Sequence, residues 1–555
     1  MVGFLSKERI IANPNYNRWL VPPAALAVHL SIGMAYGFSV FWKPLGNALV
    51  DPDGKPLETC AAGAATFADK LNGTAKALFA TDCNWTQFDL GWMYTLFFVL
   101  LGCSAALWGG WLEREGPRKA GVVSMLCWCG GLLLSAYGVY THQLWLMWLG
   151  SGVIGGVGLG LGYISPVSTL IKWFPDRRGM ATGMAIMGFG GGAMIGSPLA
   201  TKLMGLFATT TEPGVWQTFV VLAIVYAVFM LCGALGYRVP QTGWQPANWT
   251  PPATKENTMI AARHVHLKNA HKTPQFWLLW IVLCMNVSAG IGIIGAAAPM
   301  LQETFGGHLI AQPDIGFADI KKDEVLTKSA AAVGAGFVGL ISLFNIFGRF
   351  AWATSSDKLG RKRTYYIFFI LGALMYCTAT YVAGFKSLAL FVAAFCVIAS
   401  MYGGGFATIP AYLADMFGTQ FVGAIHGRLL TAWSTAGILG PVVVNYMHDT
   451  RMEAKVPFEE IYSPIFLVLA GLLVVGFIAN MLVRPVADKY FMSDTELAEV
   501  RKISHEKSSQ STTNASIINA DEQHTILVRL AWLAVLIPIS YGVWMTVQKA
   551  WALFS

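Results

Sequence analysis

Long apolar stretches recur along the whole chain and are separated by short polar segments. A helix needs roughly 20 predominantly apolar residues to cross the hydrocarbon core of a bilayer. Thirteen stretches are long enough, at residues 19–45, 87–112, 120–140, 145–173, 179–207, 215–237, 276–304, 329–353, 364–384, 388–413, 421–446, 461–484 and 526–548. The pattern predicts an all-α polytopic membrane protein embedded in a lipid bilayer.

The composition supports this interpretation and argues against a soluble enzyme. Asp, Glu, Lys and Arg make up only 12% of the 555 residues, whereas soluble domains contain about 25%. The 20 Trp residues suit anchoring at headgroups, and the 59 Gly residues allow helices to approach closely, which favours a helical bundle over a porin. The apolar stretches contain no His, Cys or acidic cluster with catalytic or metal-ligand spacing, so we expect no enzymatic activity, metal or other cofactor.

The formal charge of +8 indicates orientation in the membrane. Basic residues cluster in the loops after the second, fourth, sixth and eighth stretches, and they lack the aromatic interleaving and zinc spacing typical of nucleic-acid binding. Loops rich in Lys and Arg stay in the cytoplasm. We therefore expect no nucleic-acid partner, a cytoplasmic amino terminus and a multi-pass protein of the cell membrane, such as a bacterial inner membrane.

Two of the nine cysteines stand apart from the others. Cys60 and Cys83 occupy the long, acidic-leaning loop after the first stretch, whereas the other seven lie in apolar stretches, where we expect small hydrophobic residues. If that loop faces an oxidising compartment, the two thiols can form a disulfide. The sequence leaves a bridge and two free thiols equally open.

An internal repeat divides the chain. An offset of 244 aligns Glu113 with Asp357, and it also aligns two glycine pairs, Gly179 with Gly423 and Gly183 with Gly427. Two halves of six helices in the same orientation are typical of alternating-access carriers. The predicted units are an amino-terminal bundle at 1–237, a cytoplasmic loop at 238–275, a carboxyl-terminal bundle at 276–485, a polar linker at 486–525 and a thirteenth helix in 526–555. We expect residues 526–548 to pack on the twelve-helix body or to contact another subunit.

Several motifs resemble a known transporter family. Residues 109–119 (GGWLEREGPRK) and 353–363 (ATSSDKLGRKR) resemble the two loop signatures of the major facilitator superfamily. Residues 36–41 (YGFSVF), 158–183 (GLGLGYISPVSTLIKWFPDRRGMATG) and 345–349 (NIFGR) resemble the oxalate/formate antiporter family, which is related to the monocarboxylate transporters. The resemblance implies the major facilitator fold, with two pseudo-symmetric six-helix bundles, and transport of small organic anions such as formate, oxalate, lactate or pyruvate.

Arg349 is the central candidate for anion binding. It lies eight residues before Asp357, so a rise of about 1.5 Å per residue places it about 12 Å deeper than that loop acid, near the midplane. A midplane arginine costs at least ~2.5–3.5 kcal/mol and needs a polar partner. A structural ion pair is the alternative, but we find no clearly midplane Asp or Glu. The guanidinium fork suits a carboxylate, and the family resemblance implies the same role.

Three further residues are candidates because they share helical faces. Asn345 precedes Arg349 by four residues, so we expect it to orient Arg349 or touch substrate, with a helix–helix hydrogen bond as the alternative. His29 and Tyr36 are seven residues apart on the first helix and share a face. The resemblance implies that Tyr36 touches substrate, while His29 is either a packing residue or a ligand or proton carrier.

The resemblance also implies an aromatic lining for the site, formed by Tyr402, Phe406, Tyr163 and Phe189, although aromatic residues at such spacing also serve simple packing. The family pattern has a lysine where this chain has Trp433. Losing one of two cations should disfavour a dianion, because each carboxylate needs its own charged donor. We therefore expect a monoanion such as formate, lactate or pyruvate to be preferred over oxalate.

Three charged residues are candidate gating residues. The loop acids Glu113 and Asp357 can cap neighbouring helices. Arg428 lies about one and a half helical turns toward the cytoplasm from Trp433, and we expect Glu113 or Asp415 as its partner. We predict exchange of two anions, because an empty cationic site crosses the membrane poorly. Proton-coupled monocarboxylate symport and a non-transporting carboxylate sensor are the alternatives.

Overall fold

The computed structural model describes residues 4–13, 16–53, 55–63, 67–209, 212–241, 244–247, 249, 259–261, 263–384, 387–505 and 525–551. Parts of the predicted central loop (250–258) and polar linker (506–524) lie outside these residues. Within the described part, 13 helical segments can span a membrane, as predicted. They are Arg18–Gly46, Gln87–Glu115, Pro117–Tyr140, Leu144–Trp173, Arg178–Phe207, Val215–Gly236, Pro274–Ile310, Val325–Leu359, Arg361–Val382, Leu388–Phe417, Val422–Met452, Phe458–Leu482 and Ile526–Gln548.

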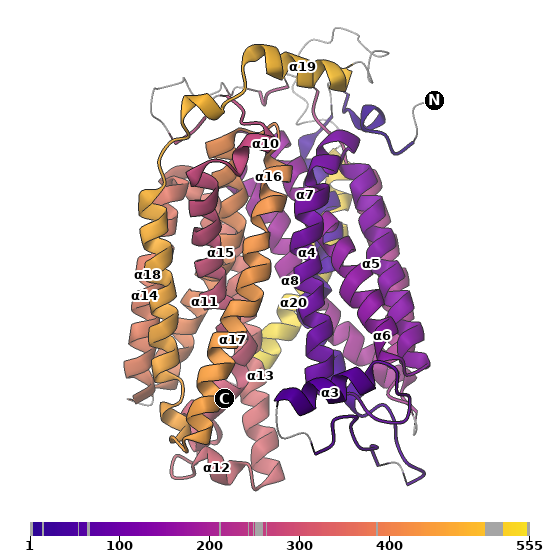
Figure 1. Ribbon diagram of the computed structural model, residues 1–555, viewed down its shortest axis with the longest axis vertical. Coiled ribbons are helices and arrows are strands. Elements are labelled where there is room, and N and C mark those ends of the chain that lie inside the picture. Colours follow the sequence, from indigo (N-terminus) through magenta and orange to yellow (C-terminus); the bar gives the residue numbers. More distant parts are fainter. Residues whose placement is uncertain are drawn as a thin grey trace.

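Figure 1 shows two helical bundles side by side, the first in purple and the second in pink and orange. The first bundle contains α1 (Val21–Ile32), α4 (Gln87–Glu115), α5 (Pro117–Tyr140), α7 (Gly156–Trp173), α8 (Arg178–Phe207) and α9 (Val215–Gly236). The second contains α11 (Pro274–Phe305), α13 (Glu324–Leu359), α14 (Arg361–Gly384), α15 (Leu388–Phe417), α16 (Val422–Leu429), α17 (Thr431–Glu453) and α18 (Ser463–Leu482). The predicted fold class is therefore confirmed.

The two ends of the bundles differ (Figure 1). One end carries the start of the chain and helix α19 (Asp494–His505), and we call it the amino-terminal face. The opposite face carries the first long loop with helix α3 (Phe67–Ala77). A disulfide joins Cys60 to Cys83 in that loop, which decides between the two possibilities that the sequence left open.

Three spans are irregular where the sequence predicts continuous helices. The first changes from α1 into the 3₁₀-helix η3 (Gly33–Phe41) and the short α2 (Trp42–Gly46). The fourth begins with α6 (Leu144–Met147) and the π-helix η4 (Trp148–Gly155), and the eleventh breaks at Leu430 between α16 and α17. Gly33, the first residue of η3, lets the first span touch α8, because a Cβ there would lie 2.2 Å from the carbonyl oxygen of Phe189. Such 3₁₀ and π segments frequently mark functional sites.

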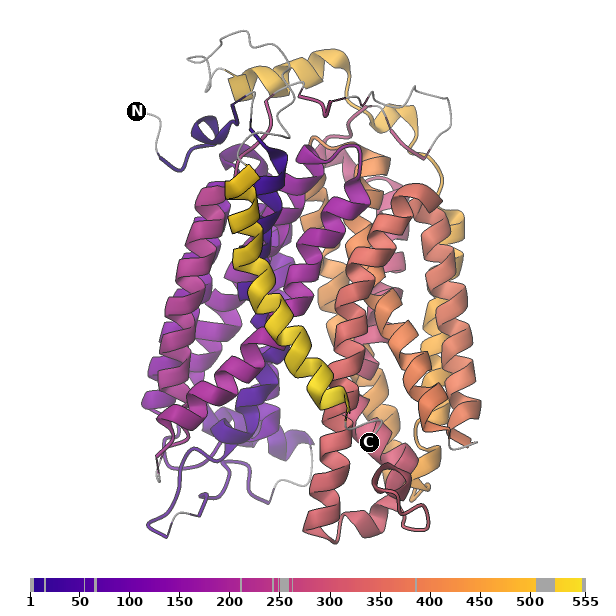
Figure 2. The same cartoon turned by 180° about the vertical axis from the view of Figure 1, so that it is seen from behind.

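The thirteenth span, helix α20 (Thr525–Trp551), crosses diagonally over both bundles (Figure 2). Near the amino-terminal face Trp532 Nε1 donates to the carbonyl oxygen of Trp19 at 3.2 Å. Further along, a Cβ on Gly339 of α13 would lie 3.2 Å from Thr546. The helix therefore packs on the twelve-helix body and touches both halves. Its outer side exposes large apolar residues, including Leu530, Leu533, Ile537 and Trp544, as expected for contact with lipid.

Candidate functional site

Arg349 lies between the two bundles and is only 1% exposed. Its Nε donates to Asn345 Oδ1 at 2.9 Å, one turn earlier on α13. Its Nη1 donates at 3.2 Å to the carbonyl oxygen of Ile186 on α8, in the other bundle. Its Nη2 is buried and has no hydrogen-bond partner among the residues that the structure describes. None of the ion pairs in the described residues includes Arg349. The guanidinium therefore has no carboxylate partner there, and its Nη2 remains an unused donor.

Aromatic rings surround this guanidinium. Its central carbon lies 5.9 Å from the ring centroid of Tyr36, 6.0 Å from that of Phe189 and 5.6 Å from that of Phe406. A cation within about 6 Å of an aromatic face is attracted by the ring quadrupole. Helix α8 leaves room for it through Gly190, where a Cβ would lie 2.9 Å from Arg349 Nε. The cation is thus held by rings and two oxygen acceptors, and no carboxylate among the described residues forms an ion pair with it.

Trp433 occupies the centre of the aromatic cluster. Its ring centroid lies 4.6 Å from that of Phe406, 5.3 Å from that of Tyr163, 5.4 Å from that of Phe98 and 5.5 Å from that of Phe189. These rings come from both bundles and pack mostly tilted or edge to face, the favoured geometry. The indole Nε1 of Trp433 and the hydroxyl of Tyr163 are both buried without hydrogen-bond partners in the described chain.

Tyr36 and Tyr402 join the two bundles beside Arg349. Their hydroxyl oxygens lie 3.3 Å apart, within hydrogen-bonding distance. Tyr402 also packs against Phe406, with ring centroids 5.6 Å apart. Both the tyrosine from the first span and the aromatic pair from the tenth therefore lie in the same cluster as Arg349.

His29 lies next to the cluster and is fully buried. Its Nδ1 lies 2.5 Å from the carbonyl oxygen of Ala185, and its Nε2 lies 3.1 Å from that of Tyr163. A neutral imidazole can donate from only one ring nitrogen, whereas an imidazolium donates from both. The neutral ring can therefore donate to one of these carbonyls, and only the protonated ring donates to both.

The structure brings all nine predicted binding residues together between the bundles, although their roles stay predictions. Sequence reasoning missed three contributors: the carbonyl of Ile186, the ring of Phe98, and His426, whose ring centroid lies 5.9 Å from that of Tyr163. His426 could have been found from its position seven residues before Trp433 on the same span. Nothing in the sequence distinguishes Phe98 from other apolar residues.

The repeat-related acids lie at the amino-terminal face, where each binds a helix of the other bundle. Asp357 on α13 accepts hydrogen bonds from the backbone N–H groups of Gly179 at 2.8 Å and Met180 at 2.9 Å. Glu113 on α4 accepts from the backbone N–H of Gly423 at 3.1 Å. These amides belong to the first turns of α8 and α16, which have no partners within their own helices. A carboxylate also complements the positive end of the helix dipole.

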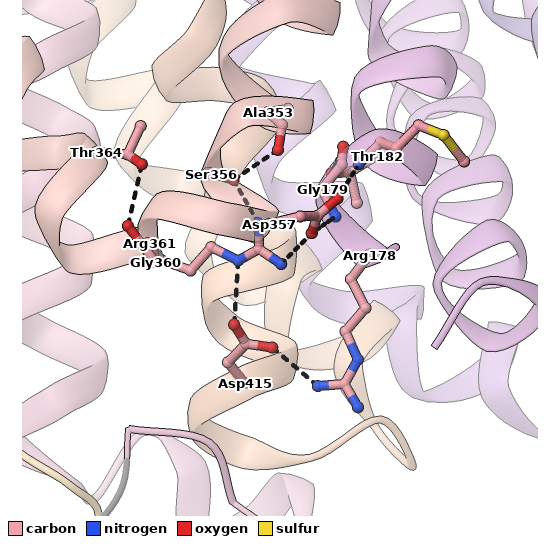
Figure 3. Close-up of polar contacts among 11 residues, drawn as sticks. Arg178, Gly179, Thr182, Ala353, Ser356, Asp357, Gly360, Arg361, Thr364 and Asp415 are labelled. Atoms are coloured by element: carbon pink, nitrogen blue, oxygen red, sulfur yellow. Dashed lines mark hydrogen bonds and ion pairs between the residues drawn. The ribbon is translucent and has the colours of Figure 1, made fainter. Parts of the chain in front are cut away.

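Further ion pairs strengthen both contacts. Figure 3 shows Arg361 between Asp357 and Asp415, at 2.6 and 3.0 Å, while Arg178 of the first bundle donates to Asp415 at 2.9 Å. Glu113, the acid that the repeat relates to Asp357, forms an ion pair with Lys172 at 2.5 Å. These contacts join the two bundles at the amino-terminal face, and Arg349 between the bundles is only 1% exposed.

Arg428 does not have the partners expected from the sequence. It donates to the carbonyl oxygen of Leu267 at 2.8 Å and lies 2.9 Å from His271 Nδ1. Both belong to the central loop, at and just after the short helix α10 (Leu267–Ala270). The expected pairing with Glu113 or Asp415 is wrong, because Arg428 bonds to this loop and both acids are bound by other residues.

Two six-helix bundles related by an internal repeat are an architecture of secondary transporters. The chain belongs to the Major Facilitator Superfamily, whose family model matches residues 59–441 and again 287–548. This membership, together with the transporter structures that share the fold, indicates a multi-pass membrane transporter and not an enzyme.

Curated relatives include transporters from bacteria and a parasite. The chain is 22% identical over 427 residues to the uncharacterized MFS-type transporter YhjX of Escherichia coli K12, covering 77% of this chain and 87% of the relative. It is 26% identical over 355 residues to the oxalate:formate antiporter of Oxalobacter formigenes, covering 62% and 73%. It is 25% identical over 387 residues to the apicoplast pyruvate carrier 1 of Toxoplasma gondii, covering 61% and 66%.

Solved structures show the same fold at low identity. The Escherichia coli fucose:proton symporter FucP aligns with a TM-score of 0.54 at 12% identity, over 84% of this chain and 99% of FucP. The human organic anion transporter TETRAN aligns with a TM-score of 0.53 at 14% identity, over 84% of this chain and all of that chain.

Replacing Asp357 with alanine tests the cap on α8. Loss of such a cap costs about 1 kcal/mol, so exchange of the amide hydrogens of residues 179–183 should become about fivefold faster in hydrogen–deuterium exchange. Asp319→Ala is the matched control, because that exposed acid pairs with Lys322 three residues away and should leave α8 unchanged. Unaltered exchange in Asp357→Ala would show that the carboxylate does not hold α8.

Proposed function

We propose that this transporter moves small carboxylate anions, of the formate, oxalate, lactate or pyruvate class, by alternating access, with Arg349 binding the carboxylate. The observation that carries the proposal is the unused Nη2 donor of a buried arginine. A buried donor without a partner costs about 1–3 kcal/mol, and more when it is charged. A carboxylate supplies both the missing acceptor and the missing negative charge.

The surrounding groups suit a small, flat anion. Aromatic rings present a positive edge to an anion, and Tyr36, Phe189 and Phe406 all lie near the guanidinium. Trp433 Nε1, which has no hydrogen-bond partner in the described chain, is a further donor for a second oxygen atom of a substrate. The names of two relatives, an oxalate:formate antiporter and a pyruvate carrier, agree with this class of substrate.

We propose a preference for monoanions within this class. Each carboxylate of a dianion needs its own charged donor. Where the family pattern has a second cation, this chain places the neutral ring of Trp433, packed at the centre of the cluster. One permanent charge then faces the substrate, and formate, lactate or pyruvate matches it better than oxalate does.

The contacts at the amino-terminal face indicate which interactions must break during alternating access. We propose that the amino-terminal face is cytoplasmic and that Glu113 and Asp357 act as its gates. Opening it requires breaking the two helix caps and the Arg178–Asp415 pair, which are individually weak enough to be reversible. Arg428 would move with the central loop to which it is bonded. Exchange is favoured because Arg349 crosses the low-dielectric interface more easily when an anion neutralises it.

Proton-coupled symport is a second candidate, and one observation favours it. His29 faces two carbonyl oxygens, and only its protonated form can donate to both. A carboxylate at Arg349 would lower the local positive charge and so make protonation of His29 easier. Anion and proton would then bind together.

Replacing Arg349 with lysine tests the binding residue. Lysine keeps the charge but loses the planar fork, so the KM for the transported carboxylate should rise about 10- to 100-fold, which corresponds to one charged hydrogen bond. The measurement is uptake of labelled formate and pyruvate into proteoliposomes. Arg451→Lys is the control, since this arginine lies at the end of α17 far from Arg349 in the sequence and donates to the carbonyl oxygen of Glu460. Unchanged KM in Arg349→Lys would remove Arg349 from the site.

Replacing Trp433 with lysine tests the selectivity. A second cation should raise the uptake of oxalate relative to formate about tenfold, because it supplies the second charged hydrogen bond. Trp433→Phe is the control, since it keeps an aromatic ring without adding charge and should not favour oxalate. Competition of unlabelled oxalate against labelled formate gives the ratio directly. A ratio that stays constant in Trp433→Lys would contradict the selectivity argument.

Vesicle loading distinguishes exchange from symport. For exchange we expect uptake of labelled anion to require internal anion and to ignore an imposed pH gradient. Symport instead predicts uptake into anion-free vesicles driven by an acidic exterior, and loss of this pH response in His29→Gln. Uptake into empty vesicles would therefore contradict obligate exchange, and indifference to the gradient would contradict symport.

A further inference from the structure

His426 is a buried polar side chain that the proposed Arg349 site does not use. It lies on α16 and is fully buried. Both ring nitrogens lack hydrogen-bond partners in the described part of the chain. Every imidazole carries at least one N–H donor, and groups left unpaired away from water destabilise the protein. A phenylalanine would fill the same space without this cost, so packing alone does not account for a histidine here.

The neighbours of His426 connect it to the central cluster. The ring centroid of His426 lies 5.9 Å from that of Tyr163. The Tyr163 centroid in turn lies 5.3 Å from that of Trp433. The Tyr163 hydroxyl and Trp433 Nε1 are also unpaired. His426 and Trp433 are seven residues apart on one span, which corresponds to about 10 Å along a helix. Three unpaired polar groups thus follow the seam between α7 and the eleventh span.

The position of His426 places it between Arg349 and the amino-terminal face. It lies three residues after Gly423, whose backbone N–H is bound by Glu113. The seam is tightly packed here, because a Cβ on Gly427 would lie 2.2 Å from the carbonyl oxygen of Ala105 on α4. The proposed opening of the Glu113 contact would separate this part of α16 from the first bundle. His426 would then be exposed to an anion that enters or leaves at that face.

We infer that His426 is a second carboxylate-contacting residue, used when the transporter is open at the amino-terminal face. It donates a ring N–H to a small carboxylate that is moving between that face and Arg349, and the Tyr163 hydroxyl is the second donor. This inference rests on the proposed carboxylate transport and extends it from one binding position to a path with two. Its distinguishing consequence is asymmetry, because Arg349 serves both faces and His426 serves only one.

The test measures exchange from each face separately in the full-length protein. Purified carrier is reconstituted in one orientation, which protease cleavage at the amino-terminal face establishes, and exchange of labelled formate and pyruvate is followed. His426→Phe should raise the KM for anion at the amino-terminal face about tenfold, equivalent to one hydrogen bond to a charged group. The KM at the opposite face should change less than about twofold by the same reasoning. His426→Gln keeps an N–H donor and should stay near the wild-type value.

Tyr163→Phe gives an independent variant, because it removes only the unpaired hydroxyl. It should raise the KM at the amino-terminal face by about threefold, as for a neutral hydrogen bond. If His426→Phe does not fold, this variant tests the inference in its place. Equal changes at both faces, or no change at either, would overturn the inference. If Arg349→Lys weakens transport from both faces while the His426 variants do not, the inference fails and the proposed function stands. A wild-type protein that moves neither anion contradicts both.

Discussion

A permanently charged guanidinium enclosed between two apolar bundles is the constraint on which the centre of this protein depends. Moving an isolated charge into a low-dielectric interior is costly unless other groups replace its water shell. Here Asn345, the Ile186 carbonyl and three aromatic rings do so. These groups come from both bundles, so the arginine draws the two halves together. Nη2 of the arginine has no hydrogen-bond partner among the described residues, and this incomplete replacement supports the proposal that an anion binds there.

The closed face balances strength against reversibility. Each repeat-related acid caps a helix of the opposite bundle, and each cap contributes about 1 kcal/mol. Because each cap contributes little free energy and the two are separate, they can keep the face closed and still be broken reversibly. The repeat therefore does more than duplicate a fold: it places two equivalent acids so that each half holds the other.

The parts of the site that follow local geometry could be predicted from the sequence. Asn345 and Arg349 are four residues apart on one helix, and they are hydrogen-bonded in the structure. The family motifs imply the aromatic residues, and three of them, Tyr36, Phe189 and Phe406, lie around the same guanidinium. The sequence predicts the wrong partners for Arg428, because its actual contacts, Leu267 and His271, belong to a polar loop without a hydrophobic pattern. The break at Leu430 was missed for a similar reason, since apolar content continues through it.

The sequence by itself determined the number of spans, the two-fold repeat and the superfamily. Each follows from patterns along the chain: apolar stretches long enough for the bilayer, and motifs that recur at a fixed offset. Only the tertiary structure decided which polar atoms are paired and which are left over. Arg349 Nη1 finds its acceptor 163 residues away, and His426 finds none in the described chain. Hydrogen bonds across the bundle interface depend on the relative position of two independently patterned halves, and no local spacing carries that information.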